Sequence, residues 1–591
     1  MEVRPGRTSI RESKMEMTPL TPQAVTILEK RYLKKDARGQ VVETPKEMFW
    51  RVAKNIAEAE RFYEDETSPE ELSEIFFQMM ASLDFLPNSP CLMNAGRDLQ
   101  QLAACFVLPV EDSLDSIFET VKQTALIHQS GGGMGFSFSH LRPKDDRVQS
   151  TGGMASGPIS FMRVFNMATD VIKQGGTRRG ANMGVLRVDH PDIIEFINVK
   201  KSLKEMENFN LSVGITKAFM EALVKDDEYD LINPRTKQPT RRWKAKEVLD
   251  TIVNAAWETG DPGVLFLDRI NEANPTPKLG EIESTNPCGE VPLLSYEPCV
   301  LGSINLLKML KEKNGKWEVD FEKIKKTVRH AVWFLDHVID MNQYPLPQIS
   351  QMAKGNRKIG LGVMGLAHFL IRLGIPYHSQ KALEVVKGIM SFIQYQAGEQ
   401  SNELAEKRGV FPYFRNSLYD KEGGMRVRNA TLTSIAPTGT LSLLANCSSG
   451  IEPLFGIQYT RKALEDTEFE MVDPLFIEMG EKKGFLNQDT LKSLSEGASL
   501  QELPQIPEEV KELFITAFEI PPVWHIKIQA AFQEYTDNAV SKTINFPRGS
   551  AKEEVREAFL MAYQERCKGI TIYRSGSKPD QVLTCGTKQV C

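Results

Sequence analysis

The chain has 591 residues, of which 41% are apolar and 25% charged, a composition that supports a large folded core and excludes a disordered protein. Its net charge of −6 comes from interspersed residues of both signs, so nothing suggests a nucleic-acid polymer as a partner. The polar N-terminal residues contain no secretory signal, and no apolar run reaches the roughly 18–20 residues that span a bilayer. We therefore expect a cytoplasmic protein that does not bind membranes.

Three regions are predicted along the chain. Residues 1–84 have mostly helical patterns that end at the breaker-rich segment 85–90. Residues 85–575 alternate strand and helix patterns, which is typical of an α/β layer or barrel. Strands are predicted at 105–110, 185–188, 209–215, 431–435 and 569–573, and helices from near Asp112, at 193–199 with Asp192 as N-cap, at 324–339 and at 441–444. Residues 576–591 are predicted to form a flexible tail.

The eight cysteines do not indicate a disulfide framework, because the chain is long and has no export signal. No C-x-x-C or paired-histidine spacing predicts a zinc site. The cysteines are therefore either buried apolar residues or redox and nucleophilic groups. They lie at Cys91, Cys105, Cys288, Cys299, Cys447, Cys567, Cys585 and Cys591.

The most informative segment is Asn286-Pro-Cys-Gly-Glu290, in a loop rich in proline and glycine. Its amide, thiol and carboxylate are spaced by two residues, so in an extended loop all three side chains face the same side. The amide can orient a hydroxyl, the carboxylate can take its proton, and the thiol can perform a covalent or radical step. The alternative from this pattern alone is a surface loop with a buried cysteine.

The segment Ala436-Pro-Thr-Gly-Thr-Leu-Ser442 follows the predicted strand at 431–435 and opens a predicted helix. Free backbone N–H groups at a helix start, together with three hydroxyls, favour an anion such as phosphate. The alternative is an ordinary threonine N-cap without a ligand.

Four motifs, in the same order along the chain, resemble the catalytic chain of ribonucleotide reductases. Residues 286–305 resemble the finger loop of that family, and residues 103–116 resemble the strand that bears a second redox cysteine. Residues 436–442 resemble the substrate phosphate loop, and residues 174–184 resemble a specificity loop. The resemblance implies a ten-stranded α/β barrel with the finger loop at its centre, preceded by a small helical N-terminal region.

The resemblance also implies a role for each catalytic residue. Cys288 would carry a thiyl radical that abstracts the 3′ hydrogen of a ribonucleotide, with a diphosphate as the expected substrate. Glu290 would take the proton of the 3′ hydroxyl, and Asn286 would hydrogen-bond to the substrate hydroxyls. Cys105 and Cys299 would supply two electrons and form a disulfide.

Binding residues follow from the same resemblance. Substrate contacts are expected from the phosphate loop and from two upstream positions, namely Pro437, Thr438, Gly439, Thr440, Ser442, Ser89 and Ala104. Contacts with a deoxynucleotide or ATP effector are expected from Asp112, Gly176, Arg178 and Arg179, although Asp112 can also be read as a helix N-cap. The specificity loops of this family work across a dimer interface, which implies a homodimer.

The radical source is expected to be adenosylcobalamin, because the strand at 569–573 carries only Tyr573 where partner-dependent relatives have a tyrosine pair. A large subunit that takes its radical from a partner protein, and an inactive nucleotide-binding relative, are the alternatives. Cys585 and Cys591 are expected to shuttle electrons from a thioredoxin- or glutaredoxin-like reductant. Alternatively, a second chain supplies this shuttle.

Overall fold

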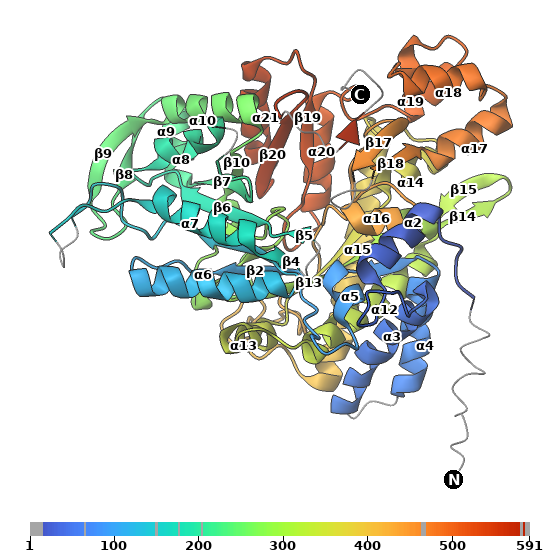
Figure 1. Cartoon of the computed structure of the whole chain (residues 1–591), viewed down its shortest axis with the longest axis horizontal. Coiled ribbons are helices and arrows are strands. Elements are labelled where there is room, and N and C mark those ends of the chain that lie inside the picture. Colours follow the sequence, from blue (N-terminus) through green and yellow to red (C-terminus); the bar gives the residue numbers. More distant parts are fainter. Residues whose placement is uncertain are drawn as a thin grey trace.

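The computed structural model describes residues 16–63, 67–147, 152–174, 178–202, 205–462, 468–578 and 583–584, with the backbone alone at 173–174, 178–179, 462 and 583–584. The N-terminal helices lie together at one end of the molecule (Figure 1). They are α2 (Pro22–Ile27), α3 (Pro45–Ala57), α4 (Pro69–Ala81) and α5 (Ser89–Asn94). The predicted helical N-terminal region is thereby confirmed.

The local sequence explains where these helices begin. Thr21, Thr44 and Ser68 each precede a proline and accept a hydrogen bond from a backbone N–H of the first turn. Proline is favoured at the first helical position because its fixed φ suits a helix and its missing N–H is not needed there. Phe76 of α4 then packs edge-on against Phe334, with ring centroids 5.0 Å apart, so the helical region is joined to the barrel by an apolar contact.

Ten strands form one sheet, as predicted. They are β1 (Phe85–Pro87), β2 (Cys105–Leu108), β3 (Gly133–Ser137), β6 (Asn182–Arg187), β7 (Phe209–Ile215), β10 (Gly263–Phe266), β13 (Pro298–Asn305), β16 (Ile359–Met364), β19 (Thr543–Phe546) and β20 (Gly569–Arg574). β2, β3, β6, β7 and β10 run parallel to one another, and β13 and β20 pair antiparallel with the two ends of this run. β13 pairs parallel with β16, and β20 pairs parallel with β19.

The segment around residue 434 closes the sheet into a barrel. Isolated bridges join Leu361 of β16 to Thr433, and Ile435 to Val540 just before β19. The prediction of a regular strand at 431–435 is therefore wrong, because the segment forms only isolated bridges. It nevertheless lies where a strand of the barrel would lie. The physical reason is that successive residues pair with different neighbours: Ser434 N–H donates to the Leu361 carbonyl at 3.1 Å, whereas Ile435 N–H donates to the Ala539 carbonyl at 3.1 Å, so no continuous ladder forms.

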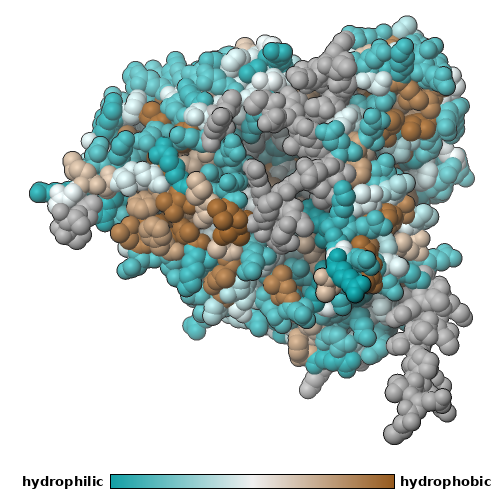
Figure 2. All heavy atoms as spheres, viewed as in Figure 1, coloured by the Kyte–Doolittle hydropathy of each residue, from teal (hydrophilic) through white to brown (hydrophobic). Residues whose placement is uncertain are grey.

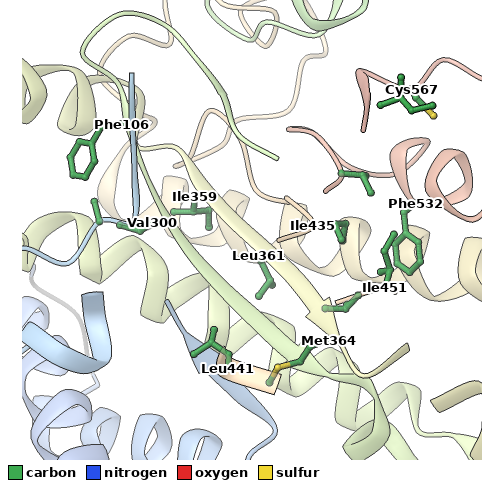
Figure 3. Packing of buried hydrophobic residues seen from close by; sticks show 14 of the residues in the cluster. Phe106, Val300, Ile359, Leu361, Met364, Ile435, Leu441, Ile451, Phe532 and Cys567 are labelled. Carbon is green, nitrogen blue, oxygen red and sulfur yellow. The ribbon is translucent and has the colours of Figure 1, made fainter. Parts of the chain in front are cut away.

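Helices cover the outside of the barrel, as the alternating pattern predicts. They include α6 (Leu114–Gln129), α7 (Pro158–Val171), α8 (Ile193–Asn198), α9 (Lys217–Val224), α10 (Ala245–Thr259), α12 (Phe321–Met341), α13 (Pro347–Asn356), α14 (Leu366–Leu373), α15 (Gln380–Arg408), α20 (Pro522–Gln533) and α21 (Lys552–Gln564). Buried apolar side chains from β16 and α20, among them Ile359, Leu361 and Phe532, belong to one continuous core (Figure 3). No helix in the described part of the chain is long and apolar enough to cross a membrane.

A smaller unit with its own apolar cluster adjoins the barrel. It contains α17 (Pro474–Lys483), α18 (Gln488–Ser495) and α19 (Glu508–Leu513), with Phe476 and Phe514 at its centre. The strands β17 (Gln458–Lys462) and β18 (Glu468–Val472) form an antiparallel pair beside it. The backbone of β21 (Leu583–Thr584) adds to β17, so the C-terminal segment reaches this pair.

Candidate active site

The predicted catalytic loop forms the tip of a small hairpin inside the barrel. Its strands are β11 (Ser284–Thr285) and β12 (Pro292–Leu293), which pair antiparallel. The tip is a turn and not the extended loop expected from the sequence, because Gly289 N–H donates to the Asn286 carbonyl at 3.1 Å and Gly289 has a φ of 82°. Val291 N–H also donates to Asn286 Oδ1 at 3.0 Å, which fixes the amide side chain.

Glycines of β3 make room for this hairpin. A Cβ at Gly135 would lie 1.8 Å from the Thr285 carbonyl oxygen, and one at Gly133 would lie 3.1 Å from Pro287. Only glycine allows the hairpin to approach the strand so closely. The glycine-rich run at 131–135 therefore serves close packing of the catalytic loop.

Two backbone contacts hold the loop from outside the hairpin. Asn210 of β7 donates from Nδ2 to the Pro287 carbonyl at 2.8 Å. The Glu290 carbonyl accepts from Ser434 Oγ at 2.8 Å and from Ala539 N–H at 2.9 Å. Cys288 lies between these anchors and is exposed, whereas Asn286 and Glu290 are each 2% exposed.

The expected reducing pair lies on adjacent strands. Cys105 of β2 and Cys299 of β13 are directly opposite Cα partners. Opposed residues of an antiparallel pair have Cα atoms about 4.5–5.5 Å apart, which lies within the range that a disulfide bridges. Neither thiol forms a disulfide bond in this structure, and both are buried in a small apolar cluster that includes Val107 and Val291.

The side chains of the loop and of the reducing pair influence one another. Burial raises the pKa of the Cys105 thiol well above its ordinary value, and Glu290, Cys299 and Cys288 raise it further. A hydrogen bond with Asn286 partly opposes this rise. The arrangement keeps Cys105 protonated, as a thiol that donates a hydrogen must be.

Glu290 has the properties of an acid–base group. Burial raises its pKa to about 7, against a partial lowering by a hydrogen bond with Asn286. Its Oε2 is buried and has no hydrogen-bond partner among the described residues. A pKa near neutrality with an open acceptor position is suited to taking and returning a proton.

The predicted phosphate loop opens the short helix α16 (Gly439–Leu444). Thr438 has a positive φ of 51°, and its Oγ1 accepts from Gly450 N–H at 2.7 Å. Ser442 Oγ pairs with Ser449 Oγ at 2.9 Å. These contacts fix the shape of the loop, and Thr438, whose oxygen only accepts within the described part of the chain, keeps its O–H free to donate to a ligand.

Arg461 is a residue that sequence reasoning missed. It lies on β17, and its Nη2 donates to the Gly439 carbonyl at 2.7 Å. A guanidinium at this position brings a permanent positive charge and several donors to the phosphate loop. The 22 residues that separate Arg461 from Gly439 left no local pattern to reveal it.

One cavity of about 810 Å³ contains the exposed Cys288, the phosphate-loop residues Pro437, Gly439 and Ser442, and Arg461. Lys542 and Glu452 also line it as an ion pair, and Glu452 Oε1 accepts from Thr543 N–H at 2.8 Å. Sequence reasoning missed this pair as well.

The other expected substrate contacts lie on neighbouring segments. Ser89 starts α5 and its Oγ is 2.7 Å from Tyr32 Oη. Ala104 precedes Cys105 and its N–H donates to the Cys299 carbonyl at 3.2 Å. Of the other cysteines, Cys91 and Cys567 are buried, whereas Cys447 is only partly buried and lines the cavity.

The expected effector residues lie on another part of the barrel. Asp112 binds Arg142 with Nε–Oδ2 at 2.8 Å, and Ser113 caps α6, so the N-cap alternative for Asp112 is wrong. Asp192 precedes α8 without a capping hydrogen bond, because its carboxylate accepts from Lys144 N–H instead. Arg178 and Arg179 form strand β5 (Arg178–Arg179), paired with β4 (Lys173–Gln174). Gly176, Cys585 and Cys591 lie outside the described residues.

Comparisons with known proteins agree with this arrangement. The barrel domain of ribonucleotide reductase matches residues 103–573, and its all-alpha domain matches residues 18–100. A vitamin B12-dependent ribonucleoside-diphosphate reductase of Thermoplasma acidophilum is 48% identical over 99% of this chain and 84% of its own length. A protein of the same description from Mycobacterium tuberculosis is 47% identical over 96% of this chain and 81% of its own.

Among solved structures, the class Id ribonucleotide reductase alpha subunit of Actinobacillus ureae has the same fold, with a TM-score of 0.77 and 24% identity over 95% of this chain and 99% of that one. With both domains matched in order and close relatives aligned over nearly the whole length, the chain belongs to the ribonucleotide reductase large-chain family.

Proposed function

We propose that this chain reduces ribonucleoside diphosphates to 2′-deoxyribonucleotides in an adenosylcobalamin-dependent radical reaction. The observation that carries the proposal is the convergence of Cys288, Asn286 and Glu290 with the opposed pair Cys105 and Cys299. The two relatives at 47–48% identity, named vitamin B12-dependent ribonucleoside-diphosphate reductases, support the diphosphate substrate and the cofactor.

The roles of the side chains follow from their positions. The substrate phosphates lie at residues 437–442 and Arg461, with Ser89 and Ala104 beside the ribose. Cys288 Sγ, exposed to the cavity, takes the 3′ hydrogen while Glu290 accepts the proton of the 3′ hydroxyl. Asn286 orients the hydroxyls. Cys105 and Cys299 then reduce C2′, and the 2′ oxygen leaves as water.

The cavity extends beyond the phosphate loop. Its volume of about 810 Å³ is near the upper end of ordinary ligand pockets. Beyond the phosphate loop it is lined by apolar and small residues, including Val540, Gly569, Ile570 and Ile572, which we propose hold adenosylcobalamin. When bound, adenosylcobalamin supplies the unpaired electron that Cys288 carries during catalysis.

The direct test is anaerobic reduction of CDP and CTP by the purified chain with dithiothreitol, with and without adenosylcobalamin. We expect deoxynucleotide only when the cofactor is present, and faster with CDP. The Cys288→Ser variant should bind nucleotide as wild type does but form no product. Turnover without cobalamin, or turnover by Cys288→Ser, would refute the proposal.

We further propose that the chain is a homodimer formed by α6 and α7. Apolar side chains recur at helical spacing on the exposed sides of these helices: Leu114, Phe118, Met167 and Val171 are 53–75% exposed. Figure 2 shows brown apolar patches over the part of this face where Figure 1 places α6 and α7. An apolar surface of this kind is typical of a protein interface, and a second copy would bury it symmetrically.

A deoxynucleotide or ATP effector is proposed to bind beside this interface. Asp112 lies just before α6, and β4 and β5 follow directly after α7, so Arg178 and Arg179 connect the proposed interface to the barrel. Equilibrium dialysis with dATP and dTTP at rising protein concentration tests both proposals. We expect effector affinity to increase as dimer forms, whereas equal affinity for monomer and dimer would contradict them.

The reductant is proposed to act through the C-terminal segment. The backbone of Leu583–Thr584 pairs with β17, which also carries Arg461 of the cavity wall. Cys585 and Cys591 follow within a few residues. Thioredoxin should therefore sustain multiple turnovers in wild type, but only a single turnover in a Cys585→Ser, Cys591→Ser variant.

A further inference from the structure

A buried ion pair lies next to the reducing thiols. Lys358 Nζ is 2.6 Å from Glu297 Oε2, and the two side chains are 2% and 1% exposed. Glu297 also accepts from Leu294 N–H at 2.7 Å and from Asn356 Nδ2. The carboxylate is therefore fixed by several donors, and it holds the Lys358 side chain in one place.

The strand register places this lysine beside Cys299. Ile359, the first residue of β16, is the Cα partner of Val300 on β13. Lys358 therefore lies at the level of Cys299, whose partner on the other side is Cys105. Residues two apart on a strand face the same side, and a Cβ at Gly360 would lie 3.5 Å from Cys299 Sγ. Lys358 thus shares a face with the Cys299 thiol.

The charges around the two thiols differ. Burial raises the pKa of Cys299, Lys358 is the largest opposing influence, and Glu290 and Glu297 add smaller rises. The pKa of Cys105 is raised by burial, by Glu290 and by the Cys299 and Cys288 thiols, and the influence that opposes this rise is a hydrogen bond with the neutral Asn286 amide and not a cation. Negative charge is therefore stabilised more on Cys299 than on Cys105.

We propose that Lys358 is a positioning residue for the reducing pair, whose ammonium stabilises negative charge on Cys299 Sγ while the two thiols are oxidised and re-reduced. This inference rests on the proposed function. In the forward reaction the 2′ C–O bond and two S–H bonds break, and a C–H, an O–H and an S–S bond form. The two electrons lost by sulfur reduce C2′. One thiol hydrogen leaves in water and the other ends on C2′.

The same charge directs re-reduction. A dithiol such as dithiothreitol attacks one sulfur of the Cys105–Cys299 disulfide, and the other leaves as a thiolate. The better-stabilised thiolate leaves faster, so attack should occur on Cys105 with Cys299 as the leaving group. Oxidation of the attacking dithiol supplies both electrons for the two restored thiols.

The test measures how fast dithiothreitol reduces this disulfide in the full chain without nucleotide, in a Cys585→Ser, Cys591→Ser background. The variants are Lys358→Met and the double variant Lys358→Met, Glu297→Gln, which leaves no unpaired buried charge. We expect reduction about tenfold slower in both, with Lys358→Arg close to wild type. Lys511→Met removes another buried lysine, paired with Glu508 at 2.8 Å away from the thiols, and should have no effect.

A second measurement separates charge stabilisation from a structural role. The midpoint potential of the pair at pH 7 should be unchanged in the double variant, because both reduced thiols are protonated and neutral. In turnover with CDP, kcat should fall with KM unchanged. Equal rates of disulfide reduction in wild type and the double variant would overturn the proposal. Because this exchange needs neither nucleotide nor cofactor, it decides the role of Lys358 even where the wild-type chain does not reduce CDP.

Discussion

Replacement of Glu290 by glutamine provides the most direct probe of the site. Burial moves the pKa of Glu290 from an ordinary 4.5 to about 7. At 1.36 kcal/mol per pKa unit, ionising this carboxyl in the folded protein costs about 3 kcal/mol more than in the unfolded chain. Because the folded pKa is raised, its contribution to stability is fully present below about pH 4.5 and is lost as pH rises through about 7.

The raised pKa of Glu290 predicts the outcome of two measurements. The free energy of unfolding of wild type should fall relative to that of Glu290→Gln by about 3 kcal/mol between pH 4.5 and 8, measured by urea denaturation. The kcat/KM of wild type for CDP should rise with pH, with an apparent pKa near 7, and the variant should show no turnover at any pH. A constant stability difference across this range would show that Glu290 is already ionised at pH 5 and would refute the reasoning.

Three further predictions concern the phosphate loop, the hairpin and the interface. Arg461→Ala should raise the KM for CDP about tenfold or more, with a smaller effect on kcat, because a charge-assisted hydrogen bond contributes about 1.5–3 kcal/mol to binding. An unchanged KM would show that Arg461 does not contact the substrate. Gly135→Ala should lower both the thermal midpoint and turnover, because its Cβ would lie 1.8 Å from the Thr285 carbonyl oxygen. Gly388→Ala, inside α15 with no atom within 4 Å of the added Cβ, should leave turnover unchanged and should not lower the thermal midpoint. Phe118→Glu should shift the sedimentation coefficient to that of a monomer, and a dimer that persists would place the interface elsewhere.

The sequence predicts those features that depend on neighbouring residues. Alternating apolar residues predict β7 at its observed bounds, and the motif at 286–290 predicts which side chains meet the reducing pair. Contacts between distant segments leave no such pattern. Lys358 and Glu297 are 61 residues apart, and Lys542 and Glu452 are 90 apart. Their partners are set by how the barrel strands and the loops beside them meet in the fold, which the periodicity of a single sequence does not specify.

The segment at 431–435 explains how the substrate and the catalytic thiol can be aligned. The backbone of this segment pairs with β16 on one side and with the segment before β19 on the other, and Ser434 also donates its side-chain hydroxyl to the Glu290 carbonyl, two residues beyond Cys288. Three residues after Ser434, the same segment becomes the phosphate loop at Pro437. One short segment therefore anchors the loop that is proposed to bear the radical and begins the loop that would hold the substrate phosphates. A shift of this segment would move both together, so the spacing between Cys288 and the proposed phosphate site is set by one short segment whose Ser434 side chain is itself buried.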